Sequence, residues 1–309
     1  MTARVQRLAA IAAIVIGVGV AAAPAAFQMF SRAPEGGTMM DEFEPYMSAD
    51  VISEFRSYLA TIETATDELA TVRSAVGDPN FDTAYVSVAQ LEAQWPTVKA
   101  DMTDLLDRMD RNLDNYAAVT ALPPFPMFPW FFVVPGVLII AGGVWALRRG
   151  TSSPVRRAPW YLVAALGLGM VAAPAMFQMF SRAPQGAEMI DDFRPMMTVE
   201  RVRDVQSYFI TLGGGESQLR ASLMPALEAT GADLADYPGI AAFSSAWPAM
   251  LQDFNPMIAT MRDNVDNFQA VDALPSFDLF PWFFVAPGVI VAAMAAIAVR
   301  RRADPITQE

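Results

Sequence analysis

The sequence predicts an all-α integral membrane protein that arose by tandem duplication. The eight residues FQMFSRAP occur at 27–34 and again, unchanged, at 177–184. Residues 109–136 match residues 261–288 at 18 of 28 positions. Four apolar runs without Asp, Glu, Lys or Arg are each about long enough to cross a bilayer core as a helix. Each repeat is therefore expected to hold a membrane helix, an extracytoplasmic helical bundle and a second membrane helix.

The composition supports membrane spans joined to water-facing domains. Hydrophobic residues make up 54% of the chain, yet 17% of its residues are charged. The chain contains neither Cys nor His. This excludes disulfide scaffolds, thiolate zinc sites, Cys nucleophiles and Ser-His-Asp triads.

The first apolar run, residues 8–27, has two interpretations. Arg4 and Arg7 precede it and small residues follow at 21–23, which is also the pattern of a cleaved signal peptide. Its internal copy at 159–180 favours a retained membrane span, because a leader is not needed in the middle of a chain.

The remaining elements follow in order. Repeat 1 (1–150) continues with an extracytoplasmic helical domain at 28–129 and a span at 130–147. A cytoplasmic linker at 151–158 leads to repeat 2 (159–309). Repeat 2 holds a span at 159–180, a helical domain at 181–281, a span at 282–299 and a short tail. The spacing between matching residues grows from 150 to 152, which places a two-residue insertion inside the second helical domain.

Apolar residues within the two polar domains recur at helical spacing. Met102, Leu106 and Met109 step by four and three, and Phe254, Ile258 and Met261 repeat the pattern. Such a stripe buries one helix face against neighbouring helices. Helix breaks are expected at Gly77 and Pro79 in the first copy, and at Gly213–Gly215, Gly231 and Pro238 in the second. Each domain is predicted to be a bundle of three or four helices.

The basic residues predict the orientation. Nine arginines lie outside the two polar domains, and all nine fall on one side of the predicted membrane. The positive-inside rule makes that side cytoplasmic. Both termini and the linker are then cytoplasmic, and both acidic domains are extracytoplasmic, in a multi-pass protein of the plasma membrane. Because each repeat returns to its starting side, the repeats share one orientation, related by a pseudo-two-fold axis along the membrane normal.

Aromatic clusters mark the points where spans meet the outer domains. Trp130 and Trp282 belong to the sequence FPWFF, which is typical of an aromatic belt at the membrane interface. A second interpretation is a groove for lipid or an apolar ligand between the repeats, formed by four phenylalanines: Phe131, Phe132, Phe283 and Phe284.

Other residues near the membrane have structural and functional interpretations. Proline within a membrane helix leaves a carbonyl unpaired and kinks the helix, so Pro24, Pro135, Pro174 and Pro287 either shape the spans or act as hinges. Arg32 and Arg182 are expected to anchor the chain at the membrane edge.

Three further patterns are interpreted as structural. Methionines that follow the spans favour apolar packing over a Cu(I) site. Acidic residues at 101, 104, 107, 110 and 114 favour a solvated helix face over calcium binding. Asn112 and Asn264, at matching positions, predict hydrogen bonds that the fold needs. No catalytic residue, metal or cofactor is predicted.

These observations favour a non-catalytic membrane protein. Its partners would be the lipid bilayer and either a protein or another copy, bound through the outer helical domains, with no nucleic acid. Such a protein would serve as a scaffold, sensor or accessory subunit of a cell-envelope complex. One alternative is a transporter or channel component for lipid or hydrophobic solute along the repeat interface. However, the spans carry no charge, and Gly136, Gly142, Gly143 and Gly288 equally suit close helix packing. A second alternative is an extracytoplasmic enzyme that uses carboxylates.

Overall fold

The computed structural model describes residues 3–148 and 157–300. Of the residues that the structure describes, 89% are helical and none lies in a strand. The all-α prediction is therefore confirmed. Most of the predicted linker (151–156) and the end of the tail (301–309) lie outside the described residues.

Four helices are long and apolar enough to cross a membrane, as predicted. They are α1 (Ala3–Ala26), α7 (Phe128–Arg148), α8 (Ala158–Met176) and α14 (Phe280–Arg300). The first and third end earlier than the apolar runs that predicted them.

The repeated FQMF sequence causes these early ends. Gln28 and Gln178 adopt positive φ angles of 55° and 53°, which a continuous right-handed helix cannot contain. The backbone N–H groups of Ser31 and Arg32 then bond to the Gln28 carbonyl, which starts the next helix. Each apolar helix is thus followed after a short turn by a second helix, α2 (Met29–Phe43) or α9 (Met179–Phe193).

The described chain forms two compact units, and each unit contains segments of both sequence halves. Unit 1 consists of Met1–Met40, Asn115–Ile190 and Asn267–Glu309, and unit 2 of Asp41–Asp114 and Asp191–Asp266. The sequence predicted a separate outer bundle for each half. In the structure, the polar segments of both halves pack into one bundle instead.

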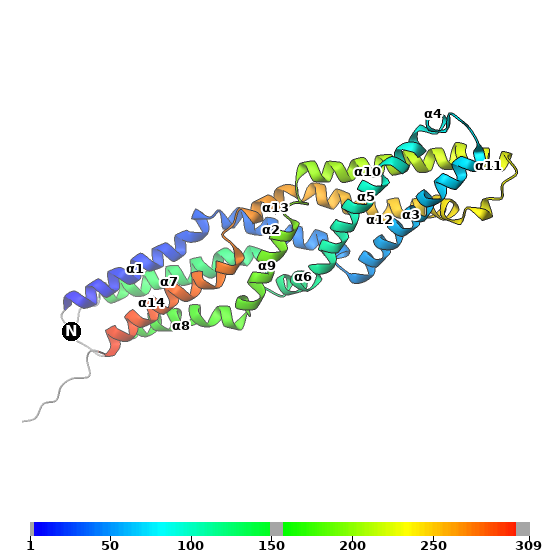
Figure 1. Cartoon of the computed structure of the whole chain (residues 1–309). Coiled ribbons are helices and arrows are strands. Elements are labelled where there is room, and N and C mark those ends of the chain that lie inside the picture. The colour runs from blue at the N-terminus through cyan, green and yellow to red at the C-terminus, as the bar shows by residue number, and fades with distance from the viewer. Residues whose placement is uncertain (1–2, 149–156, 301–309) are drawn as a thin grey trace, which may run out of the picture. The chain divides into compact units, whose positions relative to one another are not determined.

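Unit 1 contains the four apolar helices, with α1 along α7 and α8 along α14 (Figure 1). Glycines allow the close approach. A Cβ atom at Gly136 would lie 2.7 Å from the backbone nitrogen of Ala21, and one at Gly167 would lie 2.7 Å from the Gly288 carbonyl oxygen. Positions 142, 143 and 288 also approach neighbouring helices, so all four glycines named in the sequence analysis lie at close helix contacts. The short helices α6 (Leu113–Thr120) and α13 (Val265–Asp272) lie mostly in this unit.

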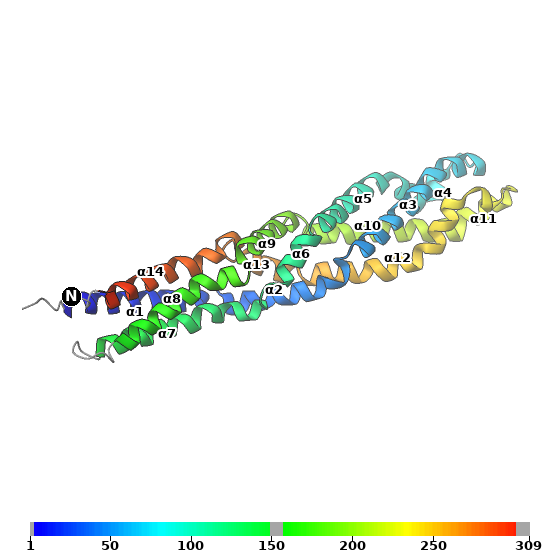
Figure 2. The same ribbon diagram turned by 90° about the horizontal axis from the view of Figure 1, so that it is seen from below.

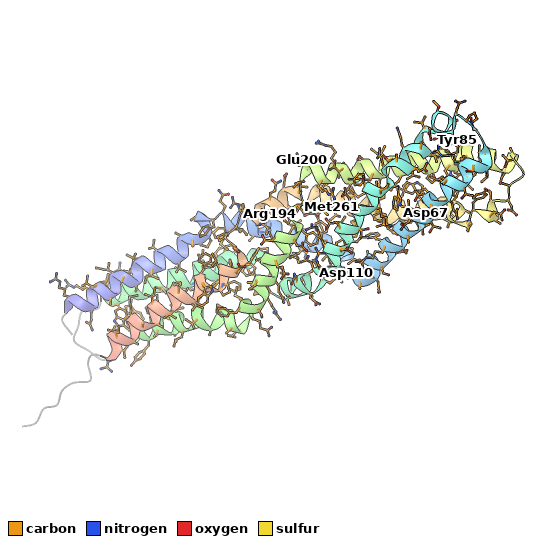
Figure 3. The ribbon with its side chains drawn as sticks, in the orientation of Figure 1. Asp67, Tyr85, Asp110, Arg194, Glu200 and Met261 are labelled. Atoms are coloured by element: carbon orange, nitrogen blue, oxygen red, sulfur yellow. The ribbon has the colours of Figure 1, made fainter. Side chains whose placement is uncertain are left out.

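Unit 2 is a bundle of four long helices that run side by side in both views (Figure 2). These are α3 (Ala49–Val76), α5 (Val86–Arg111), α10 (Val199–Gln218) and α12 (Pro238–Asp263). The predicted stripes form its core, where Phe55 stacks on Phe254 with centroids 4.4 Å apart and Met261 is buried (Figure 3). Helices α3 and α12 pack across the halves, as do α5 and α10. Short elements complete the chain: η1 (Glu44–Tyr46), α4 (Phe81–Ala84), η2 (Phe125–Met127), η4 (Leu219–Leu223), α11 (Met224–Ala229), η5 (Leu234–Asp236) and η6 (Phe277–Leu279).

The predicted helix break at Gly213–Gly215 is wrong. Helix α10 runs through these residues and continues as the π-helical turn η4 and α11. A Cβ atom at Gly215 would lie 2.8 Å from side-chain atoms of Leu91, so glycine lets α10 approach α5 closely. That packing offsets the intrinsic helix cost of glycine, about 1 kcal/mol per residue. Gly77 and Gly231, by contrast, have positive φ angles and follow helix ends, as predicted.

Candidate functional site

A ladder of phenylalanines joins the two halves within unit 1. Each rung pairs residues at matching positions, 152 apart. The ring centroids of Phe132 and Phe284 lie 4.3 Å apart in a stack. Edge-to-face contacts form two further rungs, Phe128 with Phe280 at 5.1 Å and Phe125 with Phe277 at 6.3 Å. Aromatic pairs of this geometry each contribute about 0.5–1.5 kcal/mol beyond their buried area.

The four phenylalanines of the predicted groove make different ring contacts. Phe132 and Phe284 face each other in the ladder. Phe131 instead contacts Phe177, and Phe283 contacts Phe27.

Trp130 and Trp282 lie on the outer face of unit 1. Their side chains are 55% and 56% exposed. Each meets a phenylalanine of its own half edge-on, Phe30 and Phe180, with centroids 5.7 Å apart in both cases. This outward position is what an aromatic belt at a membrane interface requires.

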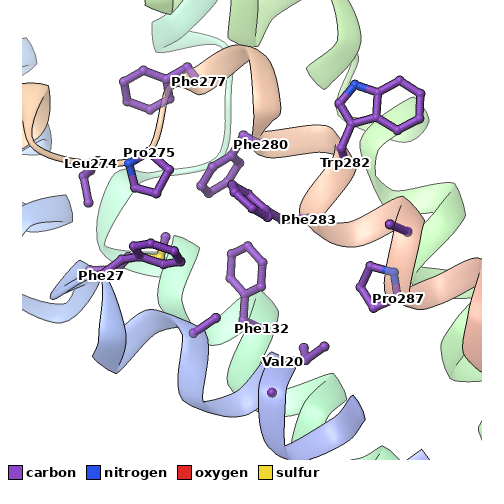
Figure 4. A pocket seen from close by; sticks show the side chains of 14 residues that line it. Val20, Phe27, Phe132, Leu274, Pro275, Phe277, Phe280, Trp282, Phe283 and Pro287 are labelled. Carbon is purple, nitrogen blue, oxygen red and sulfur yellow. The ribbon is translucent and has the colours of Figure 1, made fainter.

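An apolar pocket of about 240 Å³ lies between α1 and α14 (Figure 4). Phe27, Phe132 and Phe283 surround the space with their rings. Of the predicted aromatic residues, only Phe132, Phe283 and Trp282 belong to its wall. The full lining is Gly19, Val20, Ala23, Phe27, Met29, Phe132, Leu274, Pro275, Phe277, Phe280, Trp282, Phe283, Ala286 and Pro287.

The other half carries larger side chains at two matching positions. Met170 stands where the pocket has Val20, and Val134 stands where it has Ala286. Met170 is buried. The two faces of unit 1 therefore differ in shape although most of their residues are identical.

The four predicted proline positions lie inside helices that continue beyond them. Pro24 and Pro174 are buried near the ends of α1 and α8. Pro135 and Pro287 are half-buried in α7 and α14, and Pro287 lines the pocket. Whether any of them acts as a hinge stays a prediction.

Arg32 and Arg182 bind the ends of short helices from the opposite half. Nη1 of Arg32 donates a hydrogen bond to the carbonyl of Ala273, just after α13, at 2.9 Å. Nη1 of Arg182 donates to the carbonyl of Ala121, just after α6, at 2.8 Å. A cation at a helix C-terminus also interacts favourably with the helix dipole. Anchoring at the membrane edge stays a prediction for both.

Two tyrosine–aspartate pairs cross between the halves in unit 2. The Tyr58 hydroxyl donates to Asp253 at 2.6 Å, and the Tyr208 hydroxyl donates to Asp101. Both tyrosines and both aspartates occupy matching positions. Arg201 also binds Asp101, at 2.6 Å.

These contacts shift the pKa values of the groups involved. The hydrogen bond from Arg201 is the largest cause of the lowered pKa of Asp101. Burial and the hydrogen bond to Asp101 raise the pKa of Tyr208 to about 12. The hydrogen bond to Asp253 is the main cause of the raised pKa of Tyr58. All three groups therefore keep their ordinary charge at neutral pH.

Helix N-termini are capped across the halves in the same reciprocal way. Both carboxylate oxygens of Glu68 accept hydrogen bonds, from the backbone N–H groups of Gly239 at 2.8 Å and Ile240 at 2.9 Å. Gln218, at the matching position, uses its amide oxygen to accept from Ser87 at 2.7 Å and Val88 at 3.2 Å. Each cap satisfies backbone donors that the first helical turn leaves without a partner.

The predicted structural role of the two asparagines is confirmed. The side-chain amide of Asn112 donates to the carboxylate of Asp192 at 2.7 Å, and that of Asn264 donates to Glu42 at 2.6 Å. Both asparagines are buried. Asp192 also receives ion-pair contacts from Arg108 and Arg111, so one carboxylate joins several groups of the first half.

The acidic helix face is solvated except at one position. Asp104, Asp107 and Asp110 keep 45–48% of their side chains exposed, and they pair with Arg56 or Arg108. Asp101 keeps only 26% and joins the network described above. Among the described residues, no group of three or more Asp or Glu is placed to hold a metal ion.

The methionines that follow the spans pack in the interior. Seven of them are buried: Met29, Met39, Met40, Met179, Met189, Met196 and Met197. Their burial confirms the prediction of apolar packing.

Sequence reasoning missed the reciprocal caps and most of the pocket wall. The caps had a detectable signal, because Glu68 and Gln218 are long acceptors at matching positions next to otherwise apolar stripes. The rest of the wall had no such signal, because it depends on small differences in side-chain volume between matching positions.

Comparison of the chain with protein-family models and with curated proteins finds no match.

Proposed function

We propose that this chain is a non-catalytic, multi-pass protein of the plasma membrane that arose by tandem duplication. Its four apolar helices would hold an acidic helical unit on the extracytoplasmic side, and that unit would bind a partner. Support for the duplication comes from matched residues that make matched contacts. In the tyrosine–aspartate pairs and in the helix caps, each contact from the first half to the second is repeated by the matching residues from the second half to the first. In the phenylalanine ladder, residues at matching positions contact each other.

The observation that carries the binding proposal is the separation of charge. Unit 2 contains 27 acidic and ten basic residues, a net charge of −17 in a chain whose total is −12. Nine of the ten basic residues already form ion pairs within the unit. The remaining carboxylates therefore present a negative field, which speeds the encounter with a cationic partner. The partner is accordingly expected to carry a basic surface.

The orientation rests on the arginines. All nine of those outside the polar domains lie on one predicted side of the membrane, and the acidic segments lie on the other.

Photocrosslinking from unit 2 tests the binding proposal. A photoreactive residue at Asp67 or Glu200, both exposed, is expected to yield one discrete protein adduct in intact cells (Figure 3). The same residue at Tyr161, which is exposed on α8, serves as a control expected to give lipid adducts. Capture in isolated membranes should weaken as salt rises, because salt screens exposed charges. No discrete adduct from positions spread over all four long helices of unit 2 would contradict the proposal.

A further inference from the structure

The pocket between α1 and α14 has the size and chemistry of a site for a flexible hydrocarbon chain. Every residue in its wall is apolar. Its volume of about 240 Å³ lies below the range of about 300–1,000 Å³ that holds whole drug-sized molecules. A slim chain that enters end-on therefore fits better than a rigid polycyclic ligand.

Exposed apolar residues flank this pocket on both helices. Val18, next to the lining residue Gly19, is half exposed, and so is Trp282. Helices α1 and α14 are both long and apolar enough to span a membrane. The acyl chains of the surrounding bilayer are thus the apolar molecules that have direct access to the space.

A cation stands at the rim of the same pocket. Nη1 of Arg32 donates to the carbonyl oxygen of Ala273 at 2.9 Å and to that of Phe27 at 3.5 Å. Phe27 lines the pocket, and Ala273 precedes the lining residue Leu274. Both bonds use Nη1, so Nε and Nη2 keep the paired donor geometry that suits a phosphate group.

We propose that this pocket binds one phospholipid of the bilayer, with part of an acyl chain inside and the phosphate at Arg32. The site lies within unit 1 and goes beyond the partner binding proposed for unit 2. A phosphate next to a guanidinium supplies the charge complementarity, and the apolar walls supply the burial of the chain.

The matching face formed by α7 and α8 supplies an internal control. Met170 replaces Val20 there, and Val134 replaces Ala286. Arg182 nevertheless makes the same kind of bond as Arg32, to the carbonyl of Ala121. The face formed by α7 and α8 therefore has the equivalent arginine, but its larger side chains leave less room for an acyl chain. We accordingly expect one specifically bound lipid per chain.

Photolabelling of the full chain tests the acyl-chain site. The chain is held in dodecyl maltoside micelles, which contain no phosphate, with a trace of phosphatidylglycerol that carries a photoreactive group near the end of one acyl chain. Adducts are expected in peptides that cover residues 19–27 and 274–287. Gly19→Leu should lower this labelling about tenfold, because burial of several methylene groups is lost. Gly169→Leu is the matched control and should not change the labelling, because Gly169 does not line this pocket. Both variants should fold, since a Cβ atom at either glycine meets no atom within 4 Å.

A second pair of variants tests the phosphate contact. Arg32→Gln should lower labelling by the phospholipid probe about fivefold, the factor expected for one arginine near an anionic lipid. The same variant should leave labelling by a diacylglycerol probe with the same chain unchanged. Arg182→Gln loses an equivalent bond to a helix end and should leave both probes unaffected.

Several results would overturn the proposal. Equal labelling of both faces of the wild-type protein would indicate only the general lipid shell. Undiminished labelling in Gly19→Leu, or equal dependence of both probes on Arg32, would also overturn it. Each variant must keep the wild-type melting temperature. If Gly19→Leu does not, Val20→Met replaces it, since the chain already carries methionine at the matching position 170.

Discussion

Glu68→Ala is expected to destabilise unit 2 by about 2 kcal/mol. The substitution removes both acceptors at the N-terminus of α12 and leaves the N–H groups of Gly239 and Ile240 without a protein partner. Both of these residues are buried. An unsatisfied buried donor costs about 1–3 kcal/mol, and loss of an N-cap typically costs about 1 kcal/mol. Glu68 itself is half-buried, so water can reach part of the site. The expected cost therefore lies at the lower end of the range obtained by adding the costs of the two unsatisfied donors.

Thermal unfolding followed by circular dichroism of the full chain in detergent measures this cost. For a unit of this size, about 2 kcal/mol corresponds to a fall in melting temperature of about 4–8 °C. The Glu68→Gln variant is the matched control. Gln218 caps α5 with one amide oxygen that accepts two N–H groups, so glutamine at 68 should retain more than half of the stabilisation.

Two outcomes would refute this reasoning. A melting temperature of Glu68→Ala equal to wild type would show that the cap contributes nothing to stability. An equal loss in Glu68→Gln and Glu68→Ala would show that the carboxylate acts through its charge rather than through its hydrogen bonds.

Three further predictions follow from the described contacts. Arg201 is the main cause of the lowered pKa of Asp101. The stability that this carboxylate contributes is therefore fully present above its unfolded pKa of about 3.9, and it is lost as the pH falls through the folded pKa. In Asp101→Asn, the free energy of unfolding should consequently fall less steeply as the pH is lowered through this acid range. Gln28→Gly should raise stability, since positive φ costs a non-glycine residue about 1 kcal/mol or more, and denaturant unfolding that shows a loss would contradict this. Gly136→Ala should lower the melting temperature of unit 1 because the new methyl meets Ala21 backbone at 2.7 Å, whereas Gly19→Ala, which meets nothing, should not.

Much of the helical architecture was predictable from spacing and hydropathy alone. The four long apolar helices, the buried stripes at 102–109 and 254–261, and the hydrogen-bonding role of Asn112 and Asn264 follow from local pattern. Each of these features depends on the period of a helix or on the recurrence of a polar residue. Both signals are present in the sequence itself.

The partnering of helices was not predictable in the same way. The stripes show which face of a helix is buried, but they do not show which neighbour covers it. In unit 2, α3 packs against α12 and α5 against α10, so the polar segments of both halves share one core. The glycines at 213–215 misled for a related reason, since their low helix propensity is outweighed by close packing that only the tertiary structure reveals.

The candidate site was predictable only in part. The aromatic composition of the region was evident, and Phe132, Phe283 and Trp282 do line the pocket. The partners of each ring were not evident, because the stacked pair at 132 and 284 joins matching positions of the two halves.

Labelling of single cysteines in intact cells tests the proposed topology most directly. The chain contains no native cysteine, so each introduced thiol is the only target. With a membrane-impermeant maleimide, Asp67→Cys and Glu200→Cys are expected to react in intact cells, whereas Ser153→Cys in the linker should react only after lysis. Labelling of Ser153→Cys in intact cells, with protection of the cysteines at 67 and 200, would place the acidic unit in the cytoplasm and contradict the account.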